Sequence, residues 1–286
     1  MLNGYFSRRE QLRAWANHDA LIFGNFKETA ERITGRPLSA LRILDLGCGS
    51  NAPMTLMLHA AGGQVTGVDH MIGHRWGLGF RPSRYIDYWR EAGLARTLRK
   101  LAGEVAYDSL YYRTLSRATG LRLTDSGLDL RSMDVQNPTL PEGGFDVIHS
   151  NATWEHVKDV RAANRTVAAA IRPGGMAYIE IHLFPSLSGG HDLPWITPGR
   201  TVLGDVKPWQ HLRDPAWQAP VYLNRLRERD YRNAFEQTPG LSILEWRAEF
   251  TEGEELVTPE IRRELQDYDA SELTKRSIIV VMRKTP

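Results

Sequence analysis

The sequence contains a single cysteine, Cys48, among its 286 residues. A single cysteine cannot form an internal disulfide. The absence of disulfides is typical of proteins from reducing compartments. The chain also lacks an uncharged apolar run of the roughly 20 residues that a membrane-spanning helix needs, and residues 1–20 lack the apolar core of a signal peptide. We therefore expect a cytoplasmic protein without membrane insertion, stabilised by an ordinary hydrophobic core.

An excess of charge of one sign is also lacking, because 36 Lys and Arg face 34 Asp and Glu, which leaves a formal net charge of +2. So small a charge gives no reason to expect nucleic acid or an anionic membrane as a partner. The distribution is uneven, since residues 71–125 carry a local charge of +5 and the remainder −3. A basic surface is expected on that segment.

Short apolar runs alternate with segments of helical periodicity, which is typical of βαβ units and a mostly parallel sheet. The runs predict strands at 41–46, 64–68, 129–133, 145–150, 176–183, 241–250 and 277–284. A helical segment at 258–276 is expected between the last two strands.

We interpret residues 1–286 as one domain. Its expected parts are N-terminal helices (1–40), a strand-rich core (41–70 and 127–183), a helical insertion (71–126), a loop rich in proline and glycine (184–219), and C-terminal helices with a strand pair (220–286). The insertion carries apolar residues at helical spacing, namely Ile86, Trp89, Leu94, Leu98 and Leu101. Long irregular connections are often lids or binding loops. We expect 71–126 and 184–219 to cover a substrate.

The segment RILDLGCGSNAP, residues 42–53, places an apolar strand, an acid and two glycines before a predicted helix. Gly47 and Gly49 let the backbone approach a ligand closely, and the helix N-terminus favours a negative group such as a carboxylate. The same letters satisfy the G-x-G-x-x-A pattern of dinucleotide-binding proteins. A nicotinamide oxidoreductase is therefore an alternative on the glycines alone.

Three carboxylates refine this interpretation. Asp45 stands two residues before Gly47, where dinucleotide-binding strands usually carry an apolar residue, and it suits the ammonium group of a bound amino acid. This favours S-adenosylmethionine (SAM). Asp69 ends the second strand, from which a carboxylate accepts hydrogen bonds from ribose hydroxyls in both cofactor classes. Asp134 follows the third strand, where it can accept from an adenine amino group, although acids at such positions are often simple turn residues.

The motifs DLGCGSN, VTGVD, MDV, FDVIHSNATWEHVKD and RPGG, in this order, resemble those of class I SAM-dependent methyltransferases. The resemblance covers about 41–183, and the strand pair within 241–284 is similar to that family's terminal antiparallel hairpin. It implies an α/β fold with a seven-stranded, mostly parallel Rossmann-like sheet, helical insertions, and SAM as cofactor. It also implies the contacts: the methionine part at Asp45, Gly47 and Gly49, the ribose at Asp69, the adenine at Asp134 and Val135, and the sulfonium side at Asn151.

The glycine turn departs from the family at one position, because Asn51 replaces the third glycine often seen there. Asn tolerates a left-handed conformation, so we still expect SAM to bind. Cys48, within this turn, is expected to pack rather than to act as a nucleophile.

Methyl transfer from a sulfonium is an in-line displacement, so the protein aligns the two reactants and removes a proton where the acceptor needs it. Candidate bases should follow strands four and five, and the sequence offers His191, His156 and Glu155, with His182 as a further one. His191, in a glycine-flanked loop beside Asp192, is our first choice, since Asp192 could stabilise its imidazolium. A loop histidine satisfied by backbone or solvent is the alternative.

The pair Glu155-His156 resembles ubiquinone-type O-methyltransferases, some of which hold a divalent metal with an additional upstream Glu. That upstream place is Ala152 here, so we predict no metal ion. Hydrogen bonding of Glu155 at a helix N-terminus is the alternative role.

Aromatic residues are interleaved with the basic ones in 71–126, a mixture that can stack on a ring while Arg pairs with an anion. We expect methyl transfer to oxygen, with nitrogen second, of a small-molecule acceptor: a sugar or phosphorylated glycan intermediate, then an aromatic metabolite, then RNA. Methylation of a DNA base is disfavoured because Asn151-Ala152-Thr153-Trp154 replaces Asn-Pro-Pro-aromatic. The rival interpretations are the nicotinamide oxidoreductase and a catalytically silent partner subunit.

Overall fold

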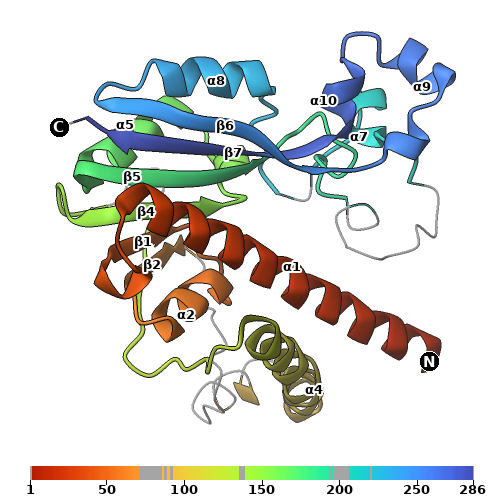
Figure 1. Ribbon diagram of the computed structural model, residues 1–286. Helices are drawn as coiled ribbons and strands as arrows, with labels where there is room; N and C mark the ends of the chain where they lie inside the picture. Colours follow the sequence, from red (N-terminus) through yellow and green to blue (C-terminus); the bar gives the residue numbers. More distant parts are fainter. Residues whose placement is uncertain are drawn as a thin grey trace.

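The computed structural model describes residues 2–70, 86, 89, 90, 93–134, 139–192, 195, 206–219 and 221–285. Its centre is a seven-stranded sheet of order β3-β2-β1-β4-β5-β7-β6 (Figure 1). The strands are β1 (Arg42–Leu46), β2 (Gln64–Asp69), β3 (Asp129–Ser132), β4 (Phe145–Asn151), β5 (Ile171–His182), β6 (Leu241–Thr251) and β7 (Lys275–Lys284). The first five are parallel, and β7 runs antiparallel to both β5 and β6. The predicted fold class, with its terminal antiparallel pair, is confirmed.

The burial of the strands follows their sequences. The β4 and β7 strands lie inside the sheet with helices or neighbouring segments on both faces, and their near-continuous apolar runs are buried. Along β6, at the sheet edge, more and less exposed residues alternate over its first half, as expected where one face meets water.

Helices cover both faces of the sheet (Figure 1). On one face lie α1 (Leu2–Thr34), α2 (Pro53–Ala60) and α4 (Leu94–Thr119), and on the other α5 (Val160–Ala170) and α8 (Glu228–Glu236). Short helices α7 (Gln210–Arg213), α9 (Pro259–Glu264) and α10 (Ala270–Thr274) gather near one end of the sheet around a third small core. The 3-10 turns are η1 (Leu38–Ala40), η3 (Trp154–His156) and η4 (Glu254–Leu256). None of the helices in the described ranges is long and apolar enough to cross a bilayer.

Three elements differ from the sequence expectation. The described residues 2–40 form one long helix and a 3-10 turn, where several helices were expected. The RPGG turn is absorbed into β5 as a bulge, because Phe145 pairs with Ile171 whereas Val147 already pairs with Met176. The predicted helix at 258–276 is interrupted, since a capping box between Asp269 and Glu272 starts α10 afresh.

In the first described part of the helical insertion, four apolar side chains are not buried. Ile86, Trp89, Leu94 and Leu98 are 43–59% exposed. The core contacts of α4 come instead from its later turns, where Tyr112 and Leu115 pack into the core shared with α1. Helical spacing therefore identified a helix here, but not its buried face.

Candidate active site

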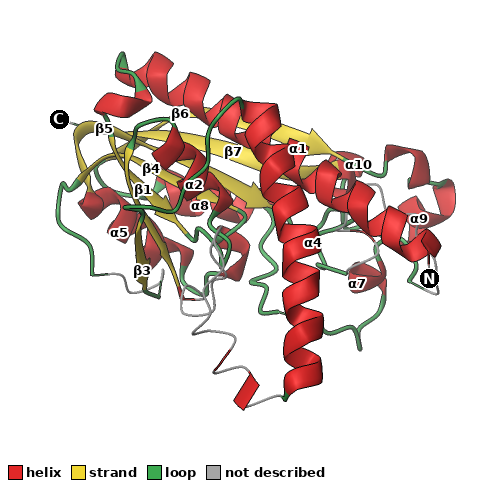
Figure 2. Cartoon of the chain, turned by 90° about the horizontal axis from the view of Figure 1, so that it is seen from below, coloured by secondary structure: helices red, strands yellow, loops and turns green. Residues whose placement is uncertain are grey.

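A cavity of about 1010 Å³ opens at the carboxyl ends of β1, β2 and β4. The sheet order reverses between β1 and β4, and such switch points are where open α/β sheets bind ligands. Its walls include the turn after β1, Asn151 to Thr153 after β4, and aromatic residues of α1 and α4. The two helices pack against each other beside the sheet (Figure 2).

The glycine turn is held by backbone hydrogen bonds to β2. The N–H groups of Gly47 and Cys48 donate to the Val68 carbonyl at 2.8 and 3.1 Å. Gly47 and Gly49 both adopt left-handed φ angles, +77° and +71°. The non-glycine residue in that conformation is Ala52 (φ +44°), at the start of α2, and not Asn51 as the departure from the glycine pattern suggested. The turn therefore keeps its shape without a third glycine.

Asp45 is 1% exposed and already has two partners within the protein. Its carboxylate accepts from the Thr55 hydroxyl at 2.5 Å and from Nδ1 of His149 at 2.8 Å. The sequence interpretation gave this carboxylate to a ligand ammonium group. In the structure its oxygens join β1, α2 and β4, and Asp45 also lines the cavity.

Asp69 links the turn to the end of β2. One of its oxygens accepts from the Gly49 N–H at 3.0 Å, and the other lies 3.3 Å from Nδ1 of His70. Asp134 lies exposed two residues past β3, and Asn151 ends β4; both line the cavity with Asp69. Val135, the second residue assigned to adenine, lies outside the described residues.

Of the predicted bases, His156 is the one that lines the cavity. Its Nδ1 lies 2.8 Å from the carbonyl oxygen of Tyr222. A carbonyl only accepts, so Nδ1 carries a proton, and in the neutral imidazole the lone pair is therefore on Nε2. His191 lies behind His156, with ring centroids 5.0 Å apart and edge-to-face, and is not among the lining residues.

Asp192 does not support His191 as we expected from the sequence. Its carboxylate accepts from Nε1 of Trp217 at 3.3 Å and lies near His211 instead. The loop turns sharply at His191 (φ +58°), so consecutive side chains diverge. His191 also binds a proton less tightly than an exposed histidine would. Burial, and secondarily the charge of His156, lowers its pKa to about 4.

Two further predictions concern Cys48 and Glu155. The Cys48 thiol is buried, and burial together with the neighbouring Asp45 raises its pKa, which keeps it protonated and agrees with a packing role. Glu155 does not bond a helix N-terminus: within the described ranges neither carboxylate oxygen has a hydrogen-bond partner. Hydrogen bonds from Asn224 to the carbonyls of Glu155 and Trp154 fix η3 with this side chain turned inward.

Sequence reasoning missed the residues that reach the cavity from α1 and from the segment before α8. Trp15 and Asp19 of α1 and Tyr222 line it, and none belongs to a recognisable motif. His149 was also missed, although a signal existed, because it is an ionisable residue in the middle of an apolar strand. No described residue of 184–219 lines the cavity.

Comparison with known proteins agrees with this geometry. Residues 12–245 match the family described as "Methyltransferase domain". An uncharacterised methyltransferase of Mycobacterium tuberculosis is 33% identical over 97 residues, 33% of this chain and 48% of that protein. A ubiquinone biosynthesis O-methyltransferase of Rhizobium leguminosarum is 30% identical over 149 residues, 51% of this chain and 42% of that protein. The chain thus spans about half the length of the curated relatives it matches.

Among solved structures, a SAM-dependent methyltransferase from Mesorhizobium loti has 22% sequence identity and a TM-score of 0.49, covering 90% of this chain and 96% of that one. The family match extends over most of the chain, from within α1 into the first part of β6, and includes every described cavity-lining residue. The chain belongs to the methyltransferase domain family, whose methyl donor is SAM.

Proposed function

We propose that this protein transfers the methyl group of SAM to an oxygen of a ring-bearing small molecule, and that donor and acceptor share the cavity at the switch point. The observation that carries the proposal is the cavity itself, which joins the glycine turn, Asp69 and the imidazole of His156 in one space. Pockets for one small ligand measure roughly 300–1,000 Å³. At about 1010 Å³ this one has room for the donor and a small acceptor.

The donor would lie along the strand ends. Gly47 and Gly49 would face its methionine part, Asp69 the ribose, Asp134 the adenine, and Asn151 the sulfonium side. The open space beside Gly49 supports this, because a Cβ built there meets no atom within 4 Å. Asp45 would act indirectly, by holding His149 under the turn.

The acceptor would lie between His156 and the aromatic side chains of α1 and α4. Trp15, Tyr111, Tyr112 and Tyr222 provide flat surfaces for a ring, which favours an aromatic or sugar ring. Lys158 is the one Lys or Arg among the described lining residues, so a polyanion such as RNA finds little support there. The name of the rhizobial relative, an O-methyltransferase, supports oxygen over nitrogen as the acceptor atom.

The lone pair on Nε2 of His156 would take the proton of the acceptor hydroxyl as the methyl group moves. The hydrogen bond to Tyr222 holds the ring in the tautomer that this requires. His191, buried behind it, is less suited because it does not line the cavity.

The experiment is transfer of labelled methyl from SAM to a panel of catechols, hydroxybenzoates and simple sugars, with products identified by mass spectrometry. Formation of a methyl ether from one of them supports the proposal. Products methylated only on amines would move the acceptor atom to nitrogen, and labelling only of RNA would overturn the small-molecule acceptor.

A further inference from the structure

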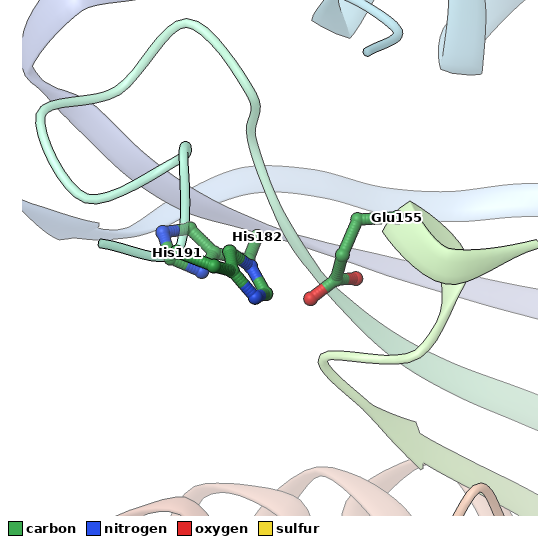
Figure 3. A group of neighbouring side chains, drawn as sticks. All are labelled: Glu155, His182 and His191. Atoms are coloured by element: carbon green, nitrogen blue, oxygen red, sulfur yellow. The ribbon is translucent and has the colours of Figure 1, made fainter. Parts of the chain in front are cut away.

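Three side chains meet behind the cavity wall, at the carboxyl ends of β4 and β5. Glu155 comes from η3, His182 ends β5, and His191 comes from the following loop. One potential ligand atom of each lies within 4.8 Å of those of the other two. The Glu155 carboxylate points toward the two imidazoles, whose rings stack with centroids 5.0 Å apart (Figure 3).

In the described part of the chain, three polar atoms of this cluster lack the partners that buried groups normally have. Glu155 is 2% exposed, and neither of its oxygens has a hydrogen-bond partner in the described part of the chain. Nε2 of His191 is also buried without one. Buried carboxylates are almost always hydrogen-bonded, paired or bound to a metal, because an isolated one costs several kcal/mol.

His182 is oriented by a chain of hydrogen bonds. The hydroxyl of Ser188 lies 2.7 Å from a Glu252 carboxylate oxygen and 2.9 Å from Nε2 of His182. A carboxylate accepts only, so the hydroxyl donates to Glu252 and must accept from an Nε2–H of His182. The lone pair is then on Nδ1. Metal-binding histidines typically donate their other ring N–H in this way, which fixes the tautomer.

We propose that Glu155, His182 and His191 bind one divalent transition-metal cation, with Zn²⁺ as the expected ion. Two imidazole nitrogens and one carboxylate oxygen form a ligand set that suits zinc and its first-row neighbours, whereas Mg²⁺ and Ca²⁺ prefer oxygen ligands throughout. Three protein ligands leave a fourth position for water or a substrate atom. The sequence prediction of no metal considered only the residues next to Glu155, and two of these ligands come from β5 and beyond.

The test measures metal content and binding directly, apart from activity. The full chain, stripped with a chelator and dialysed, is titrated with Zn²⁺ by calorimetry and with Co²⁺ by visible absorption. We expect one ion per chain and Co²⁺ bands typical of mixed nitrogen and oxygen ligands. Glu155→Gln keeps the side-chain shape and should lower Zn²⁺ affinity more than about 100-fold, and Ser188→Ala, which acts through His182, by roughly 10- to 100-fold.

Stability gives a second measurement. At about 100 times the dissociation constant, Zn²⁺ should raise the melting temperature of the wild type by roughly 5–10 °C. Glu155→Gln in chelator should melt no lower than the stripped wild type, because it removes an unpaired buried carboxylate, and it should not respond to Zn²⁺. His59→Gln, a histidine of α2 bonded to the Ser126 carbonyl, is the matched control and should respond like the wild type.

The inference is overturned if the stripped protein binds neither Zn²⁺ nor Co²⁺ at a one-to-one ratio, or if Glu155→Gln binds Zn²⁺ as tightly as His59→Gln does. SAM binding, measured on the same samples, separates this result from the proposed function. If the stripped wild type binds SAM but no metal ion, the metal site alone is contradicted and the proposed function stands.

Discussion

Gly49 and Gly120 share almost the same backbone conformation, with φ angles of +71° and +70°, and a Cβ on either meets no atom within 4 Å. Alanine at each should therefore lower the free energy of unfolding by a similar amount, about 1 kcal/mol, through left-handed strain alone. Gly49→Ala should in addition weaken SAM binding at least about tenfold, because the methyl group would stand where the donor is proposed to lie. Calorimetry on both variants checks this, and equal SAM affinity would place the donor elsewhere.

Asp45 should act on stability more than on binding. Replacing it with Ala leaves the hydroxyl of Thr55 and the Nδ1–H of His149 buried without an acceptor. Breaking such a buried network typically costs about 3–5 kcal/mol, measurable by urea unfolding. If Asp45→Ala unfolds like the wild type yet loses SAM affinity, the carboxylate faces the ligand, as the sequence interpretation held.

His156→Asn should lower kcat by about 10² to 10⁴ and leave SAM affinity within a few-fold, with whichever acceptor of the panel turns over. Asn keeps a donor near the Tyr222 carbonyl but loses the basic Nε2. His59→Asn is the control and should retain full activity. Wild-type turnover by His156→Asn would assign proton removal to another group or show that the acceptor needs none.

At the scale of elements, α1 and α4 meet around a partly buried hydrogen bond from the Tyr111 hydroxyl to Asp19. Burial raises the pKa of Asp19 from 3.8 to about 6, against the lowering effect of Tyr111. The folded protein then holds this proton more tightly than the unfolded chain does. The contribution of protonated Asp19 to the free energy of unfolding is full below about pH 4. It is lost as the pH rises to 6, and the free energy of unfolding falls by about 1.4 kcal/mol per pH unit over this range.

Asp19→Asn removes this titration. The difference in unfolding free energy between variant and wild type should therefore grow by about 3 kcal/mol between pH 4 and pH 6 and stay level above. Tyr111→Phe should extend the change to higher pH, because it removes the hydrogen bond that lowers the pKa. Urea unfolding across this range would contradict the account if the difference stayed constant.

Strand positions were predictable from the sequence because buried parallel strands such as β1 and β4 are short, apolar and bounded by turns. Interruptions within a strand or helix were not predictable from the sequence. The bulge in β5 depends on its pairing with β4, and the break before α10 depends on one local capping box. The exposed apolar start of α4 shows the same limit, since spacing along a helix does not say what covers each face.

For the whole molecule, the motifs predicted the half of the cavity formed by the strand ends. Asp69, Gly49 and Asn151 lie on its wall because parallel strands end at one edge of the sheet. The other half comes from Trp15 and Tyr222, which only the packing of α1 and the segment before α8 brings there. Contacts between segments far apart in the chain produce no residue spacing from which one sequence could predict them.

The central claim is that this cavity binds SAM, and calorimetric titration of the ligand-free protein with SAM tests it most directly. We predict a dissociation constant in the micromolar range, which corresponds to a binding free energy of about −8 kcal/mol. Asp69→Ala should weaken binding by about 1–3 kcal/mol, since the ribose hydroxyls lose their acceptor. Asp129 lies on β3, where its carboxylate accepts from Thr66 of β2 and from Arg131 of its own strand, and Asp129→Ala should bind SAM like the wild type. No heat with SAM or S-adenosylhomocysteine, alongside binding of NAD, would contradict the account.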